Sequence, residues 1–271
     1  MKIVAHTLVK NEENWVWYSL MSVVDWVDEV MVWDTGSTDN TVDVIKSIPH
    51  PKIKFRQVKA DSKAEIAQIR QDMLDATTAD WIFLVDADEI WTREGLQEIR
   101  EFVTHPGGQT VGVHRFWSLV GDVLHYLPER YGKYHVGHQT GHLTIRLMRH
   151  LPDLHVTGQY TFEGYGYSDT PVQSLSESCM HHFNHKFFHT TFLPRSSNNS
   201  PLFQRRIRYQ FGPALTADYP EVFYLSRSDF IRSPWLKHDI IFWINAFWQT
   251  PLKLLRNILL GTTWSTSRPS S

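Results

Sequence analysis

The feature that most constrains the fold is a run of apolar residues that ends in three carboxylates. Residues 81–85 read Trp-Ile-Phe-Leu-Val, and Asp86, Asp88 and Glu89 follow directly. A continuous apolar run of this length is typical of a strand that is buried on both faces. In open parallel α/β sheets, ligands bind outside the carboxyl ends of the strands. The run therefore predicts oxygen ligands at the place where a substrate would bind.

Two interpretations of these acids are open from the run alone. Because side chains alternate along an extended chain, Asp86 and Asp88 would share a side and could bind one Mg²⁺ or Mn²⁺ with waters and substrate phosphates. The alternative is the start of a helix, in which Asp88 or Glu89 caps a helix that continues through Leu96.

Strand and helix patterns alternate along the first 120 residues. Glycine and hydroxyl residues after the second strand favour a tight turn and a helix cap there. The expected order is strand 2–9, a helix through 16–27, strand 29–33, helix 40–47, strand 53–58, helix 64–76, strand 81–85, helix 94–103 and strand 110–120. Such alternation indicates an α/β fold with a mostly parallel sheet flanked by helices.

The regular alternation ends near residue 120, which divides the chain into three expected regions. We expect residues 1–120 to form one α/β half, residues 121–230 a second half, and residues 231–271 an amphipathic tail. Residues 121–142 are rich in Tyr, His and Gly, and we expect a long substrate loop there. A further strand is expected at 143–149.

The tail combines apolar residues with cations. Its apolar run at 240–248 is too short to span a bilayer, which needs roughly 20 residues. Aromatic and aliphatic side chains beside Arg232, Lys237, Lys253 and Arg256 suit a helix that lies in a membrane interface. A helix packed on the protein's own core or on a second subunit is the alternative.

Composition restricts the classes of partner. The charge is 27 minus 29, or −2, so no overall basic field points to nucleic acid, and we expect no nucleic-acid partner. A single cysteine, Cys179, excludes an internal disulfide framework.

The N-terminus has a strand pattern and lacks the features of a signal peptide. We therefore expect a cytoplasmic protein, with a possible peripheral position at the inner face of the membrane.

Four motifs occur in a fixed order along the first half. No Gly-x-Gly-x-x-Gly follows the first strand, and the chain has no Gly-Lys-Ser/Thr phosphate loop, so the usual nucleotide motifs are absent. The motifs are Lys10-Asn11-Glu12-Glu13, Asp34-Thr35-Gly36-Ser37-Thr38-Asp39-Asn40-Thr41, Arg70 in the third helix, and Asp86-Ala87-Asp88-Glu89. This ordered set resembles the family 2 inverting glycosyltransferases with a GT-A fold. Residues 146–149 followed by Phe162-Glu163 are similar to a segment of bacterial members that act on lipopolysaccharide or lipid-linked acceptors, which commonly have His-Glu instead of Phe-Glu.

The resemblance implies a metal-dependent inverting transfer of a sugar from a nucleotide-sugar donor to a glycan or lipid-linked acceptor. It also implies that residues 1–120 are the nucleotide-sugar-binding half and residues 121–230 the acceptor and catalytic half. Asp34 would contact the nucleotide, and Arg70 would lie near the diphosphate. Asp86 would contact the ribose or the metal, and Asp88 the metal, which would be Mn²⁺ or Mg²⁺. The alternatives are a turn role for Asp34 and a surface helix charge for Arg70.

An inverting transfer also needs a general base for the acceptor hydroxyl. Glu163 is our candidate, because aromatic and glycine neighbours could bury it and raise its pKa; a structural glutamate is the alternative. The resemblance places His182 in the metal shell. His181, His185 and His189 are spaced by four and could instead share a helix face, as in a metal-binding helix.

Two rival functions remain open at this stage. A catalytically silent sugar-binding or scaffold protein would use the same fold without transfer. A nucleotidyltransferase would share the α/β half but would release pyrophosphate, so product analysis separates it from a glycosyltransferase.

Overall fold

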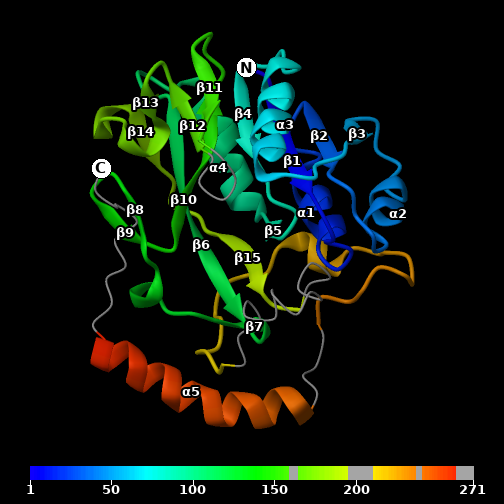
Figure 1. Ribbon diagram of the computed structural model, residues 1–271, viewed down its shortest axis with the longest axis vertical. Helices are drawn as coiled ribbons and strands as arrows, with labels where there is room; N and C mark the ends of the chain where they lie inside the picture. The colour runs from blue at the N-terminus through cyan, green and yellow to red at the C-terminus, as the bar shows by residue number, and fades with distance from the viewer. Residues whose placement is uncertain (159–163, 195–209, 236–239, 261–271) are drawn as a thin grey trace.

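A ten-stranded sheet runs through the molecule, with helices on its flanks (Figure 1). The structure is a computed structural model that describes residues 1–158, 164–194, 210–235 and 240–260. The strand order is β3-β2-β1-β4-β10-β6-β15-β5, and β14 and β7 also pair with β6. The expected α/β class with a mostly parallel sheet is confirmed.

The first half of the chain forms the parallel part of this sheet. Strand β1 pairs in parallel with both β2 and β4, and β2 pairs in parallel with β3. The elements are β1 (Ile3–Val9), α1 (Val16–Val23), β2 (Glu29–Asp34), α2 (Thr41–Lys46), β3 (Ile53–Gln57), α3 (Lys63–Asp75), β4 (Trp81–Leu84), β5 (Glu89–Ile90), α4 (Arg93–Thr104) and β6 (Val111–Val120). All four residues of β4 are buried, as a strand covered on both faces requires.

The second half adds strands to the same sheet. Strand β10 lies antiparallel between β4 and β6, whereas β14 and β15 run parallel to β6. The elements are β7 (Asp122–Tyr126), η1 (Glu129–Tyr131), β8 (Tyr134–Val136), β9 (Gln139–Gly141), β10 (Leu143–Arg149), β11 (Leu154–Thr157), β12 (Gly164–Tyr167), β13 (Thr170–Pro171), η2 (Val172–Ser174), η3 (Glu177–Cys179), β14 (Met180–His182), β15 (Phe187–Phe192), η5 (Glu221–Tyr224) and α5 (Ile240–Leu260). The sheet therefore joins strands from both sides of residue 120, and the expected region boundaries remain a prediction.

Two expectations for the second half were wrong. Residues 121–142 are not one long loop, because β7 pairs with β6 and β8 forms a hairpin with β9. These strands are three to five residues long and partly exposed, so their alternation is too short to recognise. The helix that would align His181, His185 and His189 does not form, because β14 and β15 occupy this stretch and pair with β6.

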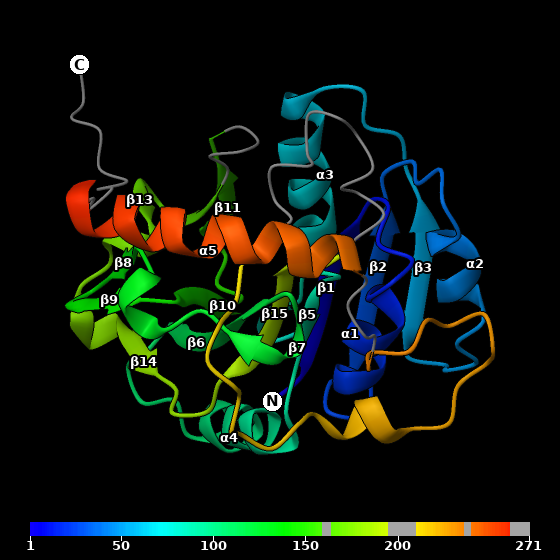
Figure 2. The same cartoon turned by 90° about the horizontal axis from the view of Figure 1, so that it is seen from below.

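Helix α5 lies along one side of the molecule, below the sheet in Figure 1, and in Figure 2, which is seen from that side, it crosses in front of the sheet. Phe242 and Ala246 are buried, and the ring of Phe211 lies 5.5 Å from that of Trp243 between centroids. The Phe211 N–H also donates to Thr250 Oγ1 at 3.0 Å. Within the described ranges, no helix has both the length and the apolar character that crossing a membrane requires.

A buried histidine in β1 generates a prediction about stability. His6 is 2% exposed, and its Nε2 lies 2.7 Å from Thr77 Oγ1. Burial, followed by the charges of Arg70 and His150, lowers the pKa of His6 to about 3. The unfolded chain takes up this proton below about pH 6.5 and the folded chain does not. Burial of neutral His6 therefore costs the folded protein no stability above about pH 6.5, whereas the free energy of unfolding decreases as the pH falls from 6.5 towards 3.

We expect wild-type protein to lose more stability between pH 7 and pH 5.5 than the His6→Gln variant, by about 1 kcal/mol, because glutamine does not titrate. Urea unfolding at the two pH values measures this difference. His105→Gln, at an exposed position, serves as the control and should retain the wild-type pH dependence. Equal pH dependence in His6→Gln and wild type would show that burial of His6 has no such effect.

Candidate active site

The acids after β4 lie in a tight turn. The Glu89 N–H donates to the Asp86 carbonyl at 2.9 Å, and residues 87 and 88 form the turn between β4 and β5. Asp86 and Asp88 therefore do not alternate as they would along an extended chain, and that premise was wrong. The helix-cap alternative was also wrong, since Thr92 caps α4 by accepting the Gly95 N–H.

Arg146 joins two of these acids. Its Nη2 lies 2.7 Å from Asp86 Oδ2, its Nε lies 3.0 Å from Glu89 Oε1, and Nη2 also contacts Glu89 Oε1. The pairing of β10 with β6 shifts register between Ile145 and Leu147, so Arg146 is the extra residue of a β-bulge. Bulges of this kind redirect a side chain and are common beside active sites.

A glycine on β6 permits close packing beside this bulge. A Cβ on Gly112 would lie 2.5 Å from Phe183 Cε2 and 2.9 Å from Leu147 Cβ. Any larger residue would displace β10 or the Phe183 ring, and with them the bulge that directs Arg146.

The acid turn keeps a negative character despite Arg146. Burial raises the pKa of Glu89 to about 7, and the charge of Arg146 acts in the opposite direction. Burial acts to lower the pKa of Arg146, but Asp86 and Glu89 outweigh it and the net change is upward. When Glu89 is protonated, the single charge of Arg146 is matched by Asp86 alone, so the adjacent Asp88 favours a further cation.

A histidine from β15 supplies a second group beside Asp88. Strand β15 pairs with β5 so that His189 lies opposite Glu89, and both the N–H and the hydroxyl of Thr190 donate to the Asp88 carbonyl. His189 Nε2 lies 3.3 Å from Asp88 Oδ2. Burial lowers the pKa of His189, but the Asp88 carboxylate outweighs it and the pKa is raised.

This spacing fits a divalent cation. Two adjacent ligands of an octahedral ion with bonds of about 2.0–2.2 Å lie roughly 3 Å apart, close to the separation of Asp88 Oδ2 and His189 Nε2. Asp86 Oδ2 is instead paired with Arg146. A bound diphosphate and waters would have to supply the remaining ligands.

The structure does not bring His182 to this turn. His182 lies opposite Val113 on β6, whereas His189 lies opposite Ser118, about 16 Å further along the strand. His182 contacts Glu177 instead. The expectation that His182 approaches Asp88 was wrong because β14 and β15 pair with opposite ends of β6. The aromatic and β-branched residues of Phe-His-Thr-Thr-Phe at 188–192 favour a strand, and this signal could have indicated His189.

Asp34 has the turn role that was the alternative interpretation. Its buried Oδ1 accepts the N–H groups of Gly36 and Ser37, each at 3.1 Å, and the Ser37 hydroxyl contacts Oδ2. Gly36 adopts a φ of +96°, which favours glycine at this turn. A nucleotide contact for Asp34 remains a proposal.

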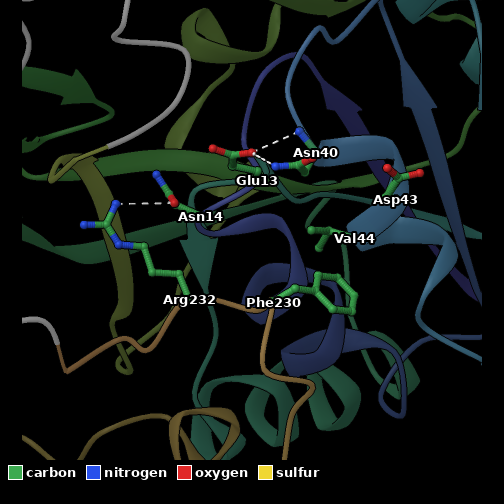
Figure 3. A pocket seen from close by; sticks show the side chains of 7 residues that line it. All are labelled: Glu13, Asn14, Asn40, Asp43, Val44, Phe230 and Arg232. Atoms are coloured by element: carbon green, nitrogen blue, oxygen red, sulfur yellow. Dashed lines mark hydrogen bonds between the residues drawn. The ribbon is translucent and has the colours of Figure 1, made fainter.

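The first motif is linked to the loop after β2. Asn11 Oδ1 accepts the Thr38 N–H at 2.7 Å, and Glu13 Oε2 accepts both the N–H and the amide of Asn40 at 2.9 and 2.8 Å. Figure 3 shows Glu13 facing Asn40, with Arg232 directed towards Asn14. These residues belong to the lining of a pocket of about 440 Å³. Its full lining is Glu13, Asn14, Asn40, Asp43, Val44, Phe230 and Arg232.

A second pocket, of about 500 Å³, contains two arginines. Arg70 reaches it from α3 and Arg146 from β10, and Leu84 at the end of β4 lines it as well. The remaining lining comes from β8, β10, β12 and η2. Gly164, which follows Glu163 in the sequence, lines this arginine pocket, whereas Glu163 itself lies outside the described residues.

Comparisons with known proteins identify relatives of the chain. The family model described as Glycosyl transferase family 2 matches residues 6–164. The SPbeta prophage-derived glycosyltransferase SunS of Bacillus subtilis strain 168 is 28% identical over 204 residues, which are 74% of this chain and 42% of SunS. A TPR repeat-containing protein of Synechococcus elongatus is 30% identical over 116 residues, which are 43% of this chain and 28% of that protein. The chain thus spans less than half the length of these relatives.

The fold also matches a solved structure. The crystal structure of S. aureus TarS 1-349 in complex with UDP-GlcNAc gives a TM-score of 0.50 at 15% identity, with 76% of this chain and 64% of that chain covered. This likeness supports the GT-A fold expected from the motifs. Because the family model covers more than half of the sequence, the chain belongs to glycosyl transferase family 2.

Proposed function

We propose that the protein is a metal-dependent inverting glycosyltransferase that moves a sugar from a nucleotide-sugar donor to a glycan or lipid-linked acceptor. The observation that carries the proposal is the pair of Asp88 and His189, which Arg146 and the acid turn connect to the arginine pocket. The family match supports sugar transfer. The UDP-GlcNAc bound to TarS makes uridine nucleotides the first probes to test.

The residues divide into three roles in this proposal. Asp88 and His189 hold Mn²⁺ or Mg²⁺, and Arg70 and Arg146 offer fixed positive charge to the diphosphate. When bound, the ion would neutralise charge that develops on the departing nucleoside diphosphate. Asp86 is held by Arg146 and keeps an exposed edge, which suits a contact with the ribose.

A separate group must deprotonate the acceptor hydroxyl as it attacks the anomeric carbon. Asp86 and Glu89 are engaged by Arg146, and Asp88 by His189, so these acids are poor candidates for the base. We retain Glu163 in this role. The position of Gly164 in the lining of the arginine pocket supports it.

The first test concerns the proposed metal ligands. We expect UDP with Mn²⁺ to raise the melting temperature of wild-type protein, and Asp88→Asn and His189→Gln to abolish the part of the shift that depends on Mn²⁺. With a nucleotide-sugar donor, both substitutions should lower release of the nucleoside diphosphate by at least about 100-fold. Thermal shift and chromatography of the products measure the two effects.

Asp75→Asn is the matched control, because Asp75 is an exposed carboxylate on α3 whose Oδ1 accepts a local hydrogen bond from the Gln71 amide. The proposal fails if neither UDP nor GDP stabilises wild-type protein with Mn²⁺ or Mg²⁺. It also fails if Asp88→Asn retains the Mn²⁺-dependent shift. Release of pyrophosphate in place of a nucleoside diphosphate would identify a nucleotidyltransferase.

The second test concerns Arg146. Its side chain is 15% exposed, and Arg146→Met would leave the carboxylates of Asp86 and Glu89 without their shared cation. We expect the free energy of unfolding to fall by about 3–5 kcal/mol and UDP affinity to fall with it. Arg146→Lys should recover part of the stability, since it restores the charge without the two-pronged geometry. Urea unfolding and UDP titration provide the measurements.

Arg93→Met is the control for Arg146, because Arg93 also binds a carboxylate through Nε, at 2.6 Å from Glu221 Oε1, but on the exposed surface. An exposed pair of this kind contributes little to stability, because water screens both charges. Equal losses in the two variants would contradict a special role for the buried arginine.

Helix α5 supports a membrane location for the acceptor. Its outer face carries exposed apolar side chains at spacings of three and four residues: Ile240, Trp243, Ile244, Phe247, Trp248, Leu252 and Leu255. The sequence of the helix contains Lys253 and Arg256 but no acid. A helix with this composition suits the interface of an anionic membrane, with aromatic rings at the head-group level. We therefore propose peripheral binding at the cytoplasmic face of a membrane.

The third test uses vesicles. We expect the protein to sediment with vesicles that contain phosphatidylglycerol. Phe247→Glu/Trp248→Glu should weaken this binding by at least about ten-fold, since carboxylates replace two aromatic side chains that would enter the membrane interface. Tyr224→Glu, at an apolar surface position that is 66% exposed, is the control. The membrane proposal fails if wild-type protein does not bind vesicles. If wild-type protein is then a dimer and the double variant a monomer, a second copy covers this face.

A further inference from the structure

Three potential metal ligands converge at a site separate from the acid turn. His138 Nδ1 lies 2.8 Å and His182 Nε2 lies 2.5 Å from the same oxygen, Glu177 Oε1. The three ligand atoms all lie within 4.8 Å of one another. Across the described ranges, this is the one group of three or more His, Cys, Asp or Glu side chains with such convergence. We refer to it as the His138 cluster.

The backbone positions the ligands before any ion arrives. Gly137 has a φ of +58°, and a Cβ there would lie 2.0 Å from Glu177 Oε2, so glycine lets the carboxylate approach the hairpin turn. The His138 N–H donates to the same oxygen at 3.2 Å. Oε2 of Glu177 is thereby held by the backbone, while Oε1 faces the two imidazoles.

The spacing is close to that of a tetrahedral zinc site. With bonds of about 2.0–2.2 Å, ligand atoms around Zn²⁺ lie roughly 3.4 Å apart, so each His–Glu distance needs to lengthen by less than about 1 Å. The His138 side chain is 68% exposed and the Glu177 side chain 42% exposed, so an ion can arrive from solvent and keep a water as its fourth ligand.

The ligand types favour a different class of ion from that at Asp88. Two imidazoles and one carboxylate bind Zn²⁺, Ni²⁺ or Cu²⁺ in preference to Mn²⁺ or Mg²⁺, in line with the affinity order of the divalent metals. If the two histidines only formed hydrogen bonds with Glu177, their ring nitrogens would have no need to lie close to each other. The two ring centroids are 5.4 Å apart, which is close enough for both histidines to bind the same ion.

We propose that His138, Glu177 and His182 bind one Zn²⁺ ion, which fastens the β8–β9 hairpin to η3 and to the end of β14. Tyr134, His135 and Val136 of β8 line the arginine pocket, so the ion would fix one wall of that pocket. The site does not depend on the transferase activity proposed above, because its ligands are distinct from Asp88 and His189.

The experiment measures Zn²⁺ binding to the full chain, freed of any purification tag. Equilibrium titration should give a stoichiometry near one, and Co²⁺ substituted for Zn²⁺ should give visible absorption bands of a low-coordinate site. Glu177→Gln and His182→Gln should each weaken Zn²⁺ binding by at least about ten-fold, because loss of even a supporting group at a metal site lowers metal affinity by about that factor. Zn²⁺ should also raise the melting temperature of wild-type protein but not of these variants.

Two control variants separate this site from others. His125→Gln removes a histidine whose Nδ1 contacts a carboxylate, Asp122 Oδ1 at 2.6 Å, outside the cluster, and it should retain wild-type Zn²⁺ affinity. Asp88→Asn should also retain it, and melting without metal shows that each variant is folded. The proposal is overturned if wild-type protein binds no Zn²⁺, if Glu177→Gln/His182→Gln binds it unchanged, or if Asp88→Asn removes it.

Discussion

The candidate site depends on a buried arginine that is shared by two acids. Arg146 contacts Asp86 and Glu89, and the Glu89 side chain is fully buried. Burial of these charges would destabilise the fold without this pairing. The pairing gives the Arg146 guanidinium hydrogen-bond acceptors and holds Asp86 and Glu89, the two ends of the acid turn, in place. The turn then fixes Asp88, whose carbonyl accepts two bonds from Thr190. The position of Asp88 thus depends on the β-bulge in β10, and that of His189 on the pairing of β15 with β5.

Much of the fold could be predicted from the sequence because its signals are local. The strands and helices of the first 120 residues have long apolar patterns, and apart from the short β5 the observed elements agree with the expected ones to within a few residues. The acids at the end of β4 were recognisable for the same reason. Their detailed arrangement was not, since a turn closed by the Glu89 N–H replaces the extended chain that the alternation argument assumed.

The rest of the site depends on contacts between residues that are distant in the sequence. The bond from Thr190 to Asp88 spans 102 positions, and it decides that His189 rather than His182 approaches the acids. Arg146 reaches the acids through a register shift that no periodicity reveals. His182 was selected as a metal ligand by resemblance. The structure instead places it in the His138 cluster, where a histidine ligand serves a different proposed ion.

The two halves of the site differ in how their geometry is fixed. In the first half, Asp34, Asn11 and Glu13 are hydrogen-bonded within and between the loops that follow β1 and β2, so internal hydrogen bonds fix the shape of these loops. Loops that are already ordered lower the entropic cost of binding a ligand. In the second half, the β8–β9 hairpin contributes one wall of the arginine pocket through two short strands, which provide few backbone bonds. A metal that joins His138 to Glu177 and His182 would supply to this wall the constraint that hydrogen bonds supply to the loops of the first half.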